Sequence, residues 1–143
     1  MGETARQTEN EQKKEFLRSY QRAKQAVSRL EAEQDELRLS QLYPRAIRYD
    51  GVPGGKSERD LSDYMSAYDE AEREIIKAKY EKMKVFQRIR NCIEAMEDET
   101  EKDILEMKYL RDWSFERIAV KLGYTYRHTI RLHGEALKHF KMS

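Results

Sequence analysis

The chain has 143 residues, of which 38% are charged and 38% hydrophobic, with a formal net charge of +1, 6 glycines and 2 prolines. This composition is too charged for an ordinary compact domain and is typical of long, solvent-exposed helices. A single cysteine, Cys92, excludes a disulfide framework and a thiolate metal site. The apolar residues are large and periodic, which argues against a disordered chain.

The charge is distributed unevenly along the chain. Residues 58–99 hold 8 basic and 12 acidic side chains, whereas residues 100–143 hold 9 basic and 6 acidic ones and all three histidines. A polyanion is therefore attracted most strongly to the C-terminal third. No apolar run approaches the ~20 residues of a membrane span, and the N-terminus lacks the apolar segment of a secretion signal. We expect a cytoplasmic protein that does not bind membranes.

The first predicted element is a long helix with one packed face. From Phe16 onward, apolar residues recur at alternating steps of four and three, as they do in coiled coils. The repeating positions are Phe16, Tyr20, Ala23, Val27, Leu30, the polar Gln34, and Leu37.

Residues 43–57 are predicted to form a bend. Pro44, Pro53 and the glycines interrupt the first helix and let the chain turn. The end of this stretch, Gly55 to Ser57, matches the end of a phosphate-binding P-loop, but Asp50 occupies the position of its first glycine. We therefore expect no nucleotide site, and we interpret Ser57 as the start of a capping box for the next helix.

A second seam runs from Leu61 to Met96 without proline or glycine. Its positions are Leu61, Tyr64 or Met65, Tyr68, Ala71, Ile75, Ala78 or Lys79, Met83, Phe86, Ile89, Ile93 and Met96. A lone charged helix of this length buries nothing, so each seam needs a partner. We predict an antiparallel hairpin of the two helices that a second copy of the chain extends into a homo-oligomer. A closed monomeric hairpin is the alternative.

The C-terminal residues 100–143 have the pattern of a helix-turn-helix unit. A short helix capped at Thr100 is expected first, and Ser114 then caps a second helix. The residues expected on the inner, core-facing side of this second helix are Phe115, Ile118, Ala119 and Leu122. Gly123 is expected to end it in the left-handed conformation, and Thr125 to cap the last helix. The inner residues expected there are Thr129, Leu132, His133, Ala136, Leu137 and Phe140.

These elements predict an all-α fold. Residues 1–99 are expected to form a two-helix coiled-coil hairpin, and residues 100–143 a small helix-turn-helix domain that binds DNA. A structural three-helix cap is the alternative interpretation of the C-terminal unit.

The outward face of the last helix carries the candidate site. The residues expected to read bases in the major groove are Tyr126, Arg127, His128 and Arg131. Those expected to contact phosphates are Ser114, Arg117, Lys121 and Thr125. From Trp113 to the end there are 6 basic and 2 acidic residues. His128 and His133 have no ligand-type companions, so neither a metal nor another cofactor is expected.

The segment LEMKYLRDWSFERIAVKLGYTYRHTIRLHGEALKHF, residues 105–140, resembles the C-terminal domain of the RinA/ArpU-type late-transcription regulators of Gram-positive phages. Those domains are in turn similar to region 4 of bacterial sigma factors. The resemblance implies an activator of late packaging and morphogenesis genes in the cytoplasm of a bacterial host, with RNA polymerase as a second partner. Thr129 departs from the family, which tends to carry valine there, and its hydroxyl needs a carbonyl partner one turn back.

The leading hypothesis is therefore a sequence-specific DNA-binding transcription regulator. The first alternative is the DNA-recognition small subunit of a phage terminase, which assembles as a ring. The second is a coiled-coil interaction adaptor that does not bind DNA. No nucleophile–base or paired-carboxylate arrangement stands out, so we do not expect an enzyme.

Overall fold

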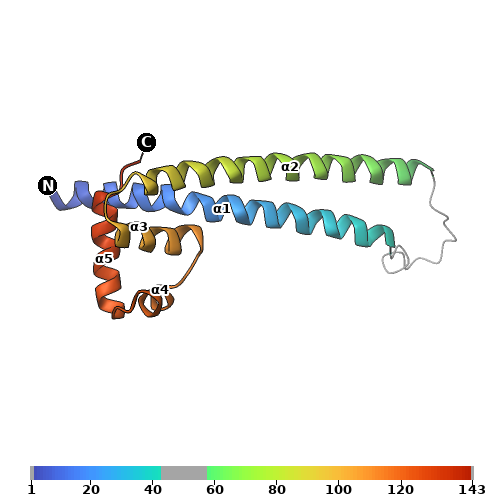
Figure 1. Ribbon diagram of the computed structural model, residues 1–143. Coiled ribbons are helices and arrows are strands. Elements are labelled where there is room, and N and C mark those ends of the chain that lie inside the picture. Colours follow the sequence, from blue (N-terminus) through green and yellow to red (C-terminus); the bar gives the residue numbers. More distant parts are fainter. Residues whose placement is uncertain (1, 43–57, 143) are drawn as a thin grey trace. The chain divides into compact units, whose positions relative to one another are not determined.

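The computed structural model describes residues 2–42 and 58–142, and its regular elements are helices (Figure 1). They are α1 (Gly2–Leu42), α2 (Glu58–Glu94), α3 (Glu99–Leu105), the π-helical turn η2 (Glu106–Leu110), α4 (Phe115–Leu122) and α5 (Tyr126–His139). Helices α1 and α2 form a long antiparallel hairpin, and a small unit of three helices follows. This arrangement confirms the predicted fold class.

The predicted bend at 43–57, with its prolines and capping box, lies outside the described residues. Within residues 2–42 and 58–142, none of the helices has the length and apolar character that a bilayer span requires. The chain divides into two compact units, one made of Met1–Ala23 with Lys82–Ser143 and one made of Lys24–Glu81. The first unit therefore includes the beginning of α1 and the end of α2, and not only the residues after 99.

The unit of residues 24–81 is a two-helix hairpin with a thin core. Its buried apolar residues are Val27 and Ile75, which both belong to the predicted seams. Polar contacts join the helices beside them. The Gln34 amide donates to a Glu72 carboxylate oxygen at 2.5 Å, and the Lys79 ammonium lies 3.6 Å from Glu31. Gln34 thus continues the seam through a hydrogen bond between the two helices.

The other unit has a continuous core that joins distant parts of the chain. The buried residues of this core cluster come from α1, α2, α3, η2 and α5 and from the residues just after α2 and α5: Leu17, Ile89, Cys92, Ile93, Met96, Leu105, Tyr109, Leu110, Ala136, Leu137 and Phe140. The ring of Phe16 lies 6.0 Å from that of Phe140, and Tyr20 lies 5.2 Å from Phe86. The C-terminal helices therefore share one core with the beginning of α1 and the end of α2.

The second seam is largely confirmed, with corrections at Met83 and at its start. Met83 is 62% exposed and Leu61 48% exposed, although both were expected to face the partner helix. Lys82 is half-buried instead. A helix with 3.6 residues per turn drifts against a seven-residue repeat, so the inner track passes from Ala78 through Lys82 to Phe86.

The capping predictions are confirmed for two helices and wrong for a third. The side-chain oxygens of Ser114 and Thr125 accept the backbone N–H groups of Arg117 and His128. The cap of α3, however, is Asp98, whose carboxylate accepts the backbone N–H of Glu101 at 2.9 Å. An aspartate at this position binds the exposed amides of the first turn as well as serine or threonine does, and the helix therefore begins before Thr100.

Candidate nucleic-acid interface

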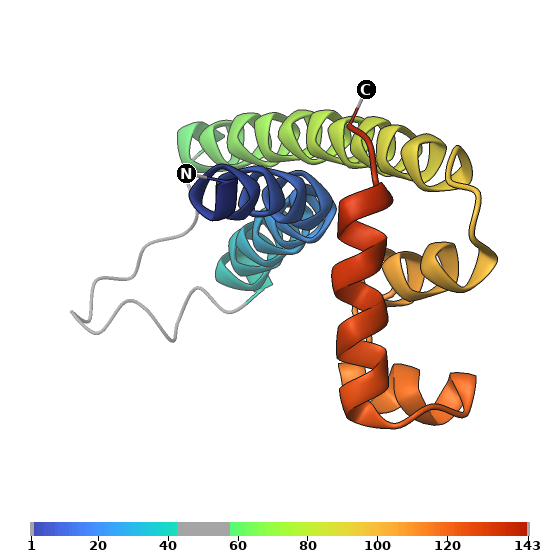
Figure 2. The same ribbon diagram turned by 90° about the vertical axis from the view of Figure 1, so that its left-hand side faces the viewer.

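The turn between α4 and α5 has the predicted geometry. Gly123 has a φ of 74°, which is the left-handed conformation that glycine adopts without steric cost. The backbone N–H of Tyr124 donates to the carbonyl of Ala119 at 2.9 Å and closes the end of α4. Ala119 is buried beneath the turn. The tight turn lets α5 leave in a new direction, which can be followed in Figure 2.

One face of α5 is buried along its whole length. Thr129, Ala136 and Phe140 are each 0% exposed, and Leu137 is 2% exposed. The Thr129 hydroxyl donates to the carbonyl of Thr125 at 2.9 Å, which confirms the partner expected for it. The inner face of α5 is therefore the predicted one.

The opposite face of the first half of α5 is open to solvent. Tyr126 is 51% exposed, Ile130 is 37% exposed, and both Arg127 and Arg131 are exposed. In the part of the chain that the structure describes, no aspartate or glutamate forms an ion pair with Arg127 or Arg131. Their charges are therefore available to an anionic partner.

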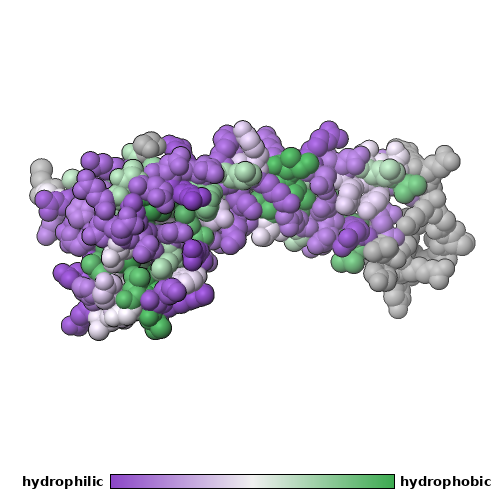
Figure 3. All heavy atoms as spheres, viewed as in Figure 1, coloured by the Kyte–Doolittle hydropathy of each residue, from purple (hydrophilic) through white to green (hydrophobic). Residues whose placement is uncertain are grey.

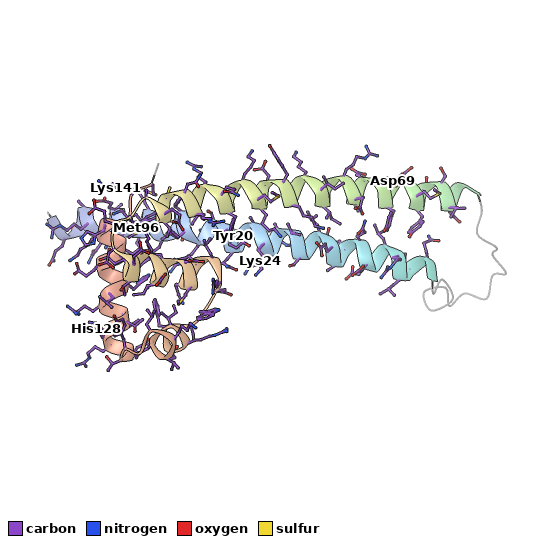
Figure 4. The ribbon with its side chains drawn as sticks, viewed as in Figure 1. Tyr20, Lys24, Asp69, Met96, His128 and Lys141 are labelled. Atoms are coloured by element: carbon purple, nitrogen blue, oxygen red, sulfur yellow. The ribbon has the colours of Figure 1, made fainter. Side chains whose placement is uncertain are left out.

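His128 differs from the other three predicted base-reading residues, because its ring is already engaged within the protein. It is half-buried near the Thr125 end of α5, where Figure 4 labels it. Its Nδ1 lies 3.1 Å from a guanidinium nitrogen of Arg131. The ring of Tyr124 stands nearly perpendicular to it, with centroids 4.9 Å apart. The structure thus joins His128 and Arg131 directly, while Tyr126 and Arg127 are neighbours on the same half of the helix.

The four predicted phosphate contacts are exposed but differ in how they are held. Ser114 and Thr125 serve as caps, so their oxygens accept backbone N–H groups and their hydroxyl protons remain able to donate. The Arg117 guanidinium lies over the Trp113 ring, 3.8 Å from its centroid, and such a cation–π contact restrains a long side chain. Lys121 lies on the same helix, one turn after Arg117.

The support of α5 from the beginning of α1 was not predicted. The ammonium group of Lys13, a buried residue, donates to the backbone carbonyls of Leu137 at 2.8 Å and Lys138 at 3.4 Å. The Gln21 amide donates to the carbonyl of Tyr109 at 3.1 Å. Lys13, Leu17 and Gln21 recur every four residues, so they lie on one face of α1. This spacing is the only sequence signal that pointed to a second packed face of α1.

A buried histidine lies beneath the candidate interface. The Tyr109 hydroxyl and Nε2 of His133 are 2.8 Å apart, and the edge of the Phe115 ring packs against the imidazole. Burial, together with the positive charges of Lys14, Lys108 and Arg18, lowers the pKa of His133 to about 4. Burial also raises the pKa of Tyr109 to about 12. His133 is therefore neutral at pH 7, and it is part of the buried side of α5 that packs against Tyr109 and Phe115.

The remaining histidine, His139, links the end of α5 to α3 through a polar contact. Its Nδ1 lies 2.9 Å from both carboxylate oxygens of the buried Glu101. The three histidines thus occupy three separate environments.

Comparison of the chain with protein-family models, with curated proteins and with solved structures finds no match.

Proposed function

We propose that the chain is a sequence-specific DNA-binding transcription regulator. In this proposal α5 enters the major groove, and α4 contacts the phosphates of the DNA. The resemblance of residues 105–140 to phage late-transcription regulators extends this proposal to activation of late phage genes, with RNA polymerase as a second partner. The resemblance alone supports the activator role, whereas the described geometry supports the contact with DNA.

The observation that carries the proposal is the pair of exposed arginines on the first half of α5. Arg127 and Arg131 are exposed and lie on the face opposite to the buried residues Thr129 and Ala136. A helix that presents its first turns to the major groove reads guanine O6 and N7 through such guanidinium groups. The exposed cations Arg117 and Lys121 on α4 and the cap hydroxyl groups of Ser114 and Thr125 match the positions from which phosphates are contacted.

Arg127→Ala is expected to weaken binding to the preferred site by about 1–3 kcal/mol and to relax the preference at one base pair. The reason is the loss of a bidentate donor pair that only guanine matches fully. The measurement is selection of bound duplexes from a random pool at two salt concentrations, followed by titration of wild type and variant against the selected site.

Lys121→Ala serves as the contrasting variant in the same titrations. A phosphate contact is lost equally on every sequence, so all affinities should fall together and the slope against log salt should shrink by about one. Arg73→Ala, which removes an exposed cation from α2, is the matched control and should change neither quantity. Unchanged affinity and preference in both Arg127→Ala and Lys121→Ala would contradict the proposal.

Protein interaction is the second candidate function, and one surface of α4 favours it. Val120 is 84% exposed and lines a shallow hollow together with Trp113, Glu116, Arg117 and Lys121. A hollow that combines an exposed apolar residue with tryptophan and arginine has the residue types that are enriched in protein–protein contacts. Val120→Ser should leave DNA binding unchanged if this hollow serves a protein partner.

Self-association through the long helices is part of the proposed function. Within the described residues of the 24–81 unit, the large apolar side chains that are exposed outnumber the two that are buried. The exposed ones are Leu39, Leu61, Met65, Ile76 and Tyr80. Figure 3 shows apolar side chains on the surface of the middle of α2. A second hairpin packed on this surface would remove them from water.

Ile76→Glu is expected to weaken self-association by at least about tenfold, because burying an isoleucine contributes about 1.5–3 kcal/mol and a symmetric dimer contains the contact twice. The measurement is molar mass by light scattering across a concentration series, with Gln25→Glu as the control that adds the same charge at an exposed polar site. A wild-type dimer supports the regulator, and a ring of eight or nine chains supports the terminase subunit. A wild-type chain that stays monomeric, or an Ile76→Glu variant with unchanged mass, would refute this interface.

A further inference from the structure

The exposed half of α5 contains one side chain pair that is already hydrogen-bonded before any ligand arrives. A guanidinium nitrogen of Arg131 lies 3.1 Å from Nδ1 of His128, one turn earlier on the helix. The backbone N–H of His128 donates to the Thr125 cap at 3.1 Å, and the Tyr124 ring packs edge-on against the imidazole. The backbone of His128 is therefore fixed by the cap, and its imidazole, the acceptor in this pair, packs against Tyr124.

The chemistry of the pair assigns the proton on the histidine. A guanidinium group carries only donors, so Nδ1 of His128 must accept and carries no proton. The neutral imidazole then bears its hydrogen on Nε2. One N–H of Arg131 is directed at the histidine, and its remaining N–H groups are left for a partner. No carboxylate within the described ranges forms an ion pair with them.

We propose that His128 is a positioning residue that orients Arg131 to read guanine, and not a base-reading residue itself. Arginine has a long side chain whose freedom is lost on binding. A hydrogen bond made in the free protein removes part of that cost beforehand. The free N–H groups then present donors only, which match the two acceptors, N7 and O6, that guanine shows in the major groove. This inference rests on the proposed binding of DNA.

Two substitutions separate the acceptor of His128 from its ring. His128→Asn keeps an acceptor close to the position of Nδ1 but removes the ring. His128→Phe keeps a ring that packs against Tyr124 but removes the acceptor. Arg131→Ala identifies the base pair concerned, since it is the one whose preference disappears when the guanidinium is lost.

The experiment measures the preference for guanine over the other bases at that base pair, by competition among duplexes that differ only there. We expect His128→Phe to lose about tenfold in this preference and His128→Asn to retain it. Nitrogen-15 NMR of the free protein should show His128 with its proton on Nε2. Thermal unfolding of both variants provides the check that each is folded.

The outcomes distinguish the inference from the function on which it rests. Full preference in His128→Phe, equal loss in both variants, or a proton on Nδ1 would overturn the positioning role while DNA binding by the wild type persists. Absence of any salt-dependent DNA binding by the wild type would overturn the proposed function and this inference with it.

Discussion

Leu17→Ala is expected to lower the free energy of unfolding of the unit formed by residues 1–23 and 82–143 by about 2–5 kcal/mol. Leu17 is 0% exposed and belongs to the core that also contains Tyr109 and Phe140. Removing its side chain leaves a cavity between elements that are far apart in the sequence. Because a typical domain is stable by only 5–15 kcal/mol, this loss is a large fraction of the total.

Urea unfolding, monitored by tryptophan fluorescence, measures this effect in the unit that contains Leu17. Trp113 is the only tryptophan, and it lies just before α4, with the Arg117 guanidinium over its ring. Leu39→Ala is the matched control, since it is the same substitution on the same helix at a side chain that is 49% exposed. It should shift the transition by less than about 0.5 kcal/mol. An equal shift in both variants would mean that α1 does not stabilise the C-terminal helices.

The packing of Leu17 against the C-terminal helices was not predicted from the sequence pattern. The seam from Phe16 to Leu37 described α1 as a helix with one packed face, because a heptad repeat identifies a single partner. The structure gives the first part of α1 a second face, with Lys13 and Gln21 bonded to carbonyls that lie 124 and 88 residues further along the chain. Contacts of that separation leave no local period, so the only sequence signal for them was the four-residue spacing of Lys13, Leu17 and Gln21 on one face of α1.

The turn, the caps and the helix faces around the candidate site were predicted more fully, because their determinants are local. Ser114, Gly123 and Thr125 control their own turns through hydrogen bonds that span three to five residues. The buried face of α5 follows from its apolar period, and the exposed face is its complement. The contact between His128 and Arg131 is equally local but depends on side-chain rotamers, which the pattern of residue types does not specify. The two residues were therefore assigned the same role, whereas their geometry differs.

The histidine on the inner face of α5 is expected to make the protein sensitive to acid. His133 is 8% exposed and bonded to the Tyr109 hydroxyl. Burial, with Lys14, Lys108 and Arg18 nearby, lowers its pKa from 6.5 to about 4. Between these two values the unfolded chain binds a proton that the folded chain does not bind. The free energy of unfolding therefore falls as the pH falls through this window.

The expected loss between pH 7 and pH 4 is on the order of 3 kcal/mol, since each unit of pKa difference corresponds to about 1.4 kcal/mol. His133→Gln removes the titrating group while its amide oxygen still accepts from Tyr109. The measurement is the free energy of unfolding at several pH values, for wild type and variant. Carboxylates titrate in the same range in both proteins, so the difference between the two curves isolates the histidine.

Leu39→Ala is the control for this comparison, because it changes an exposed side chain that does not titrate. Its curve should run parallel to that of the wild type, whereas the curve of His133→Gln should flatten between pH 6.5 and 4. Parallel curves for His133→Gln and the wild type would show that His133 takes up its proton equally in the folded and unfolded chains. The core of α5 would then have to admit water or an anion beside the imidazole, and the hydrogen bond to Tyr109 would not hold the ring neutral.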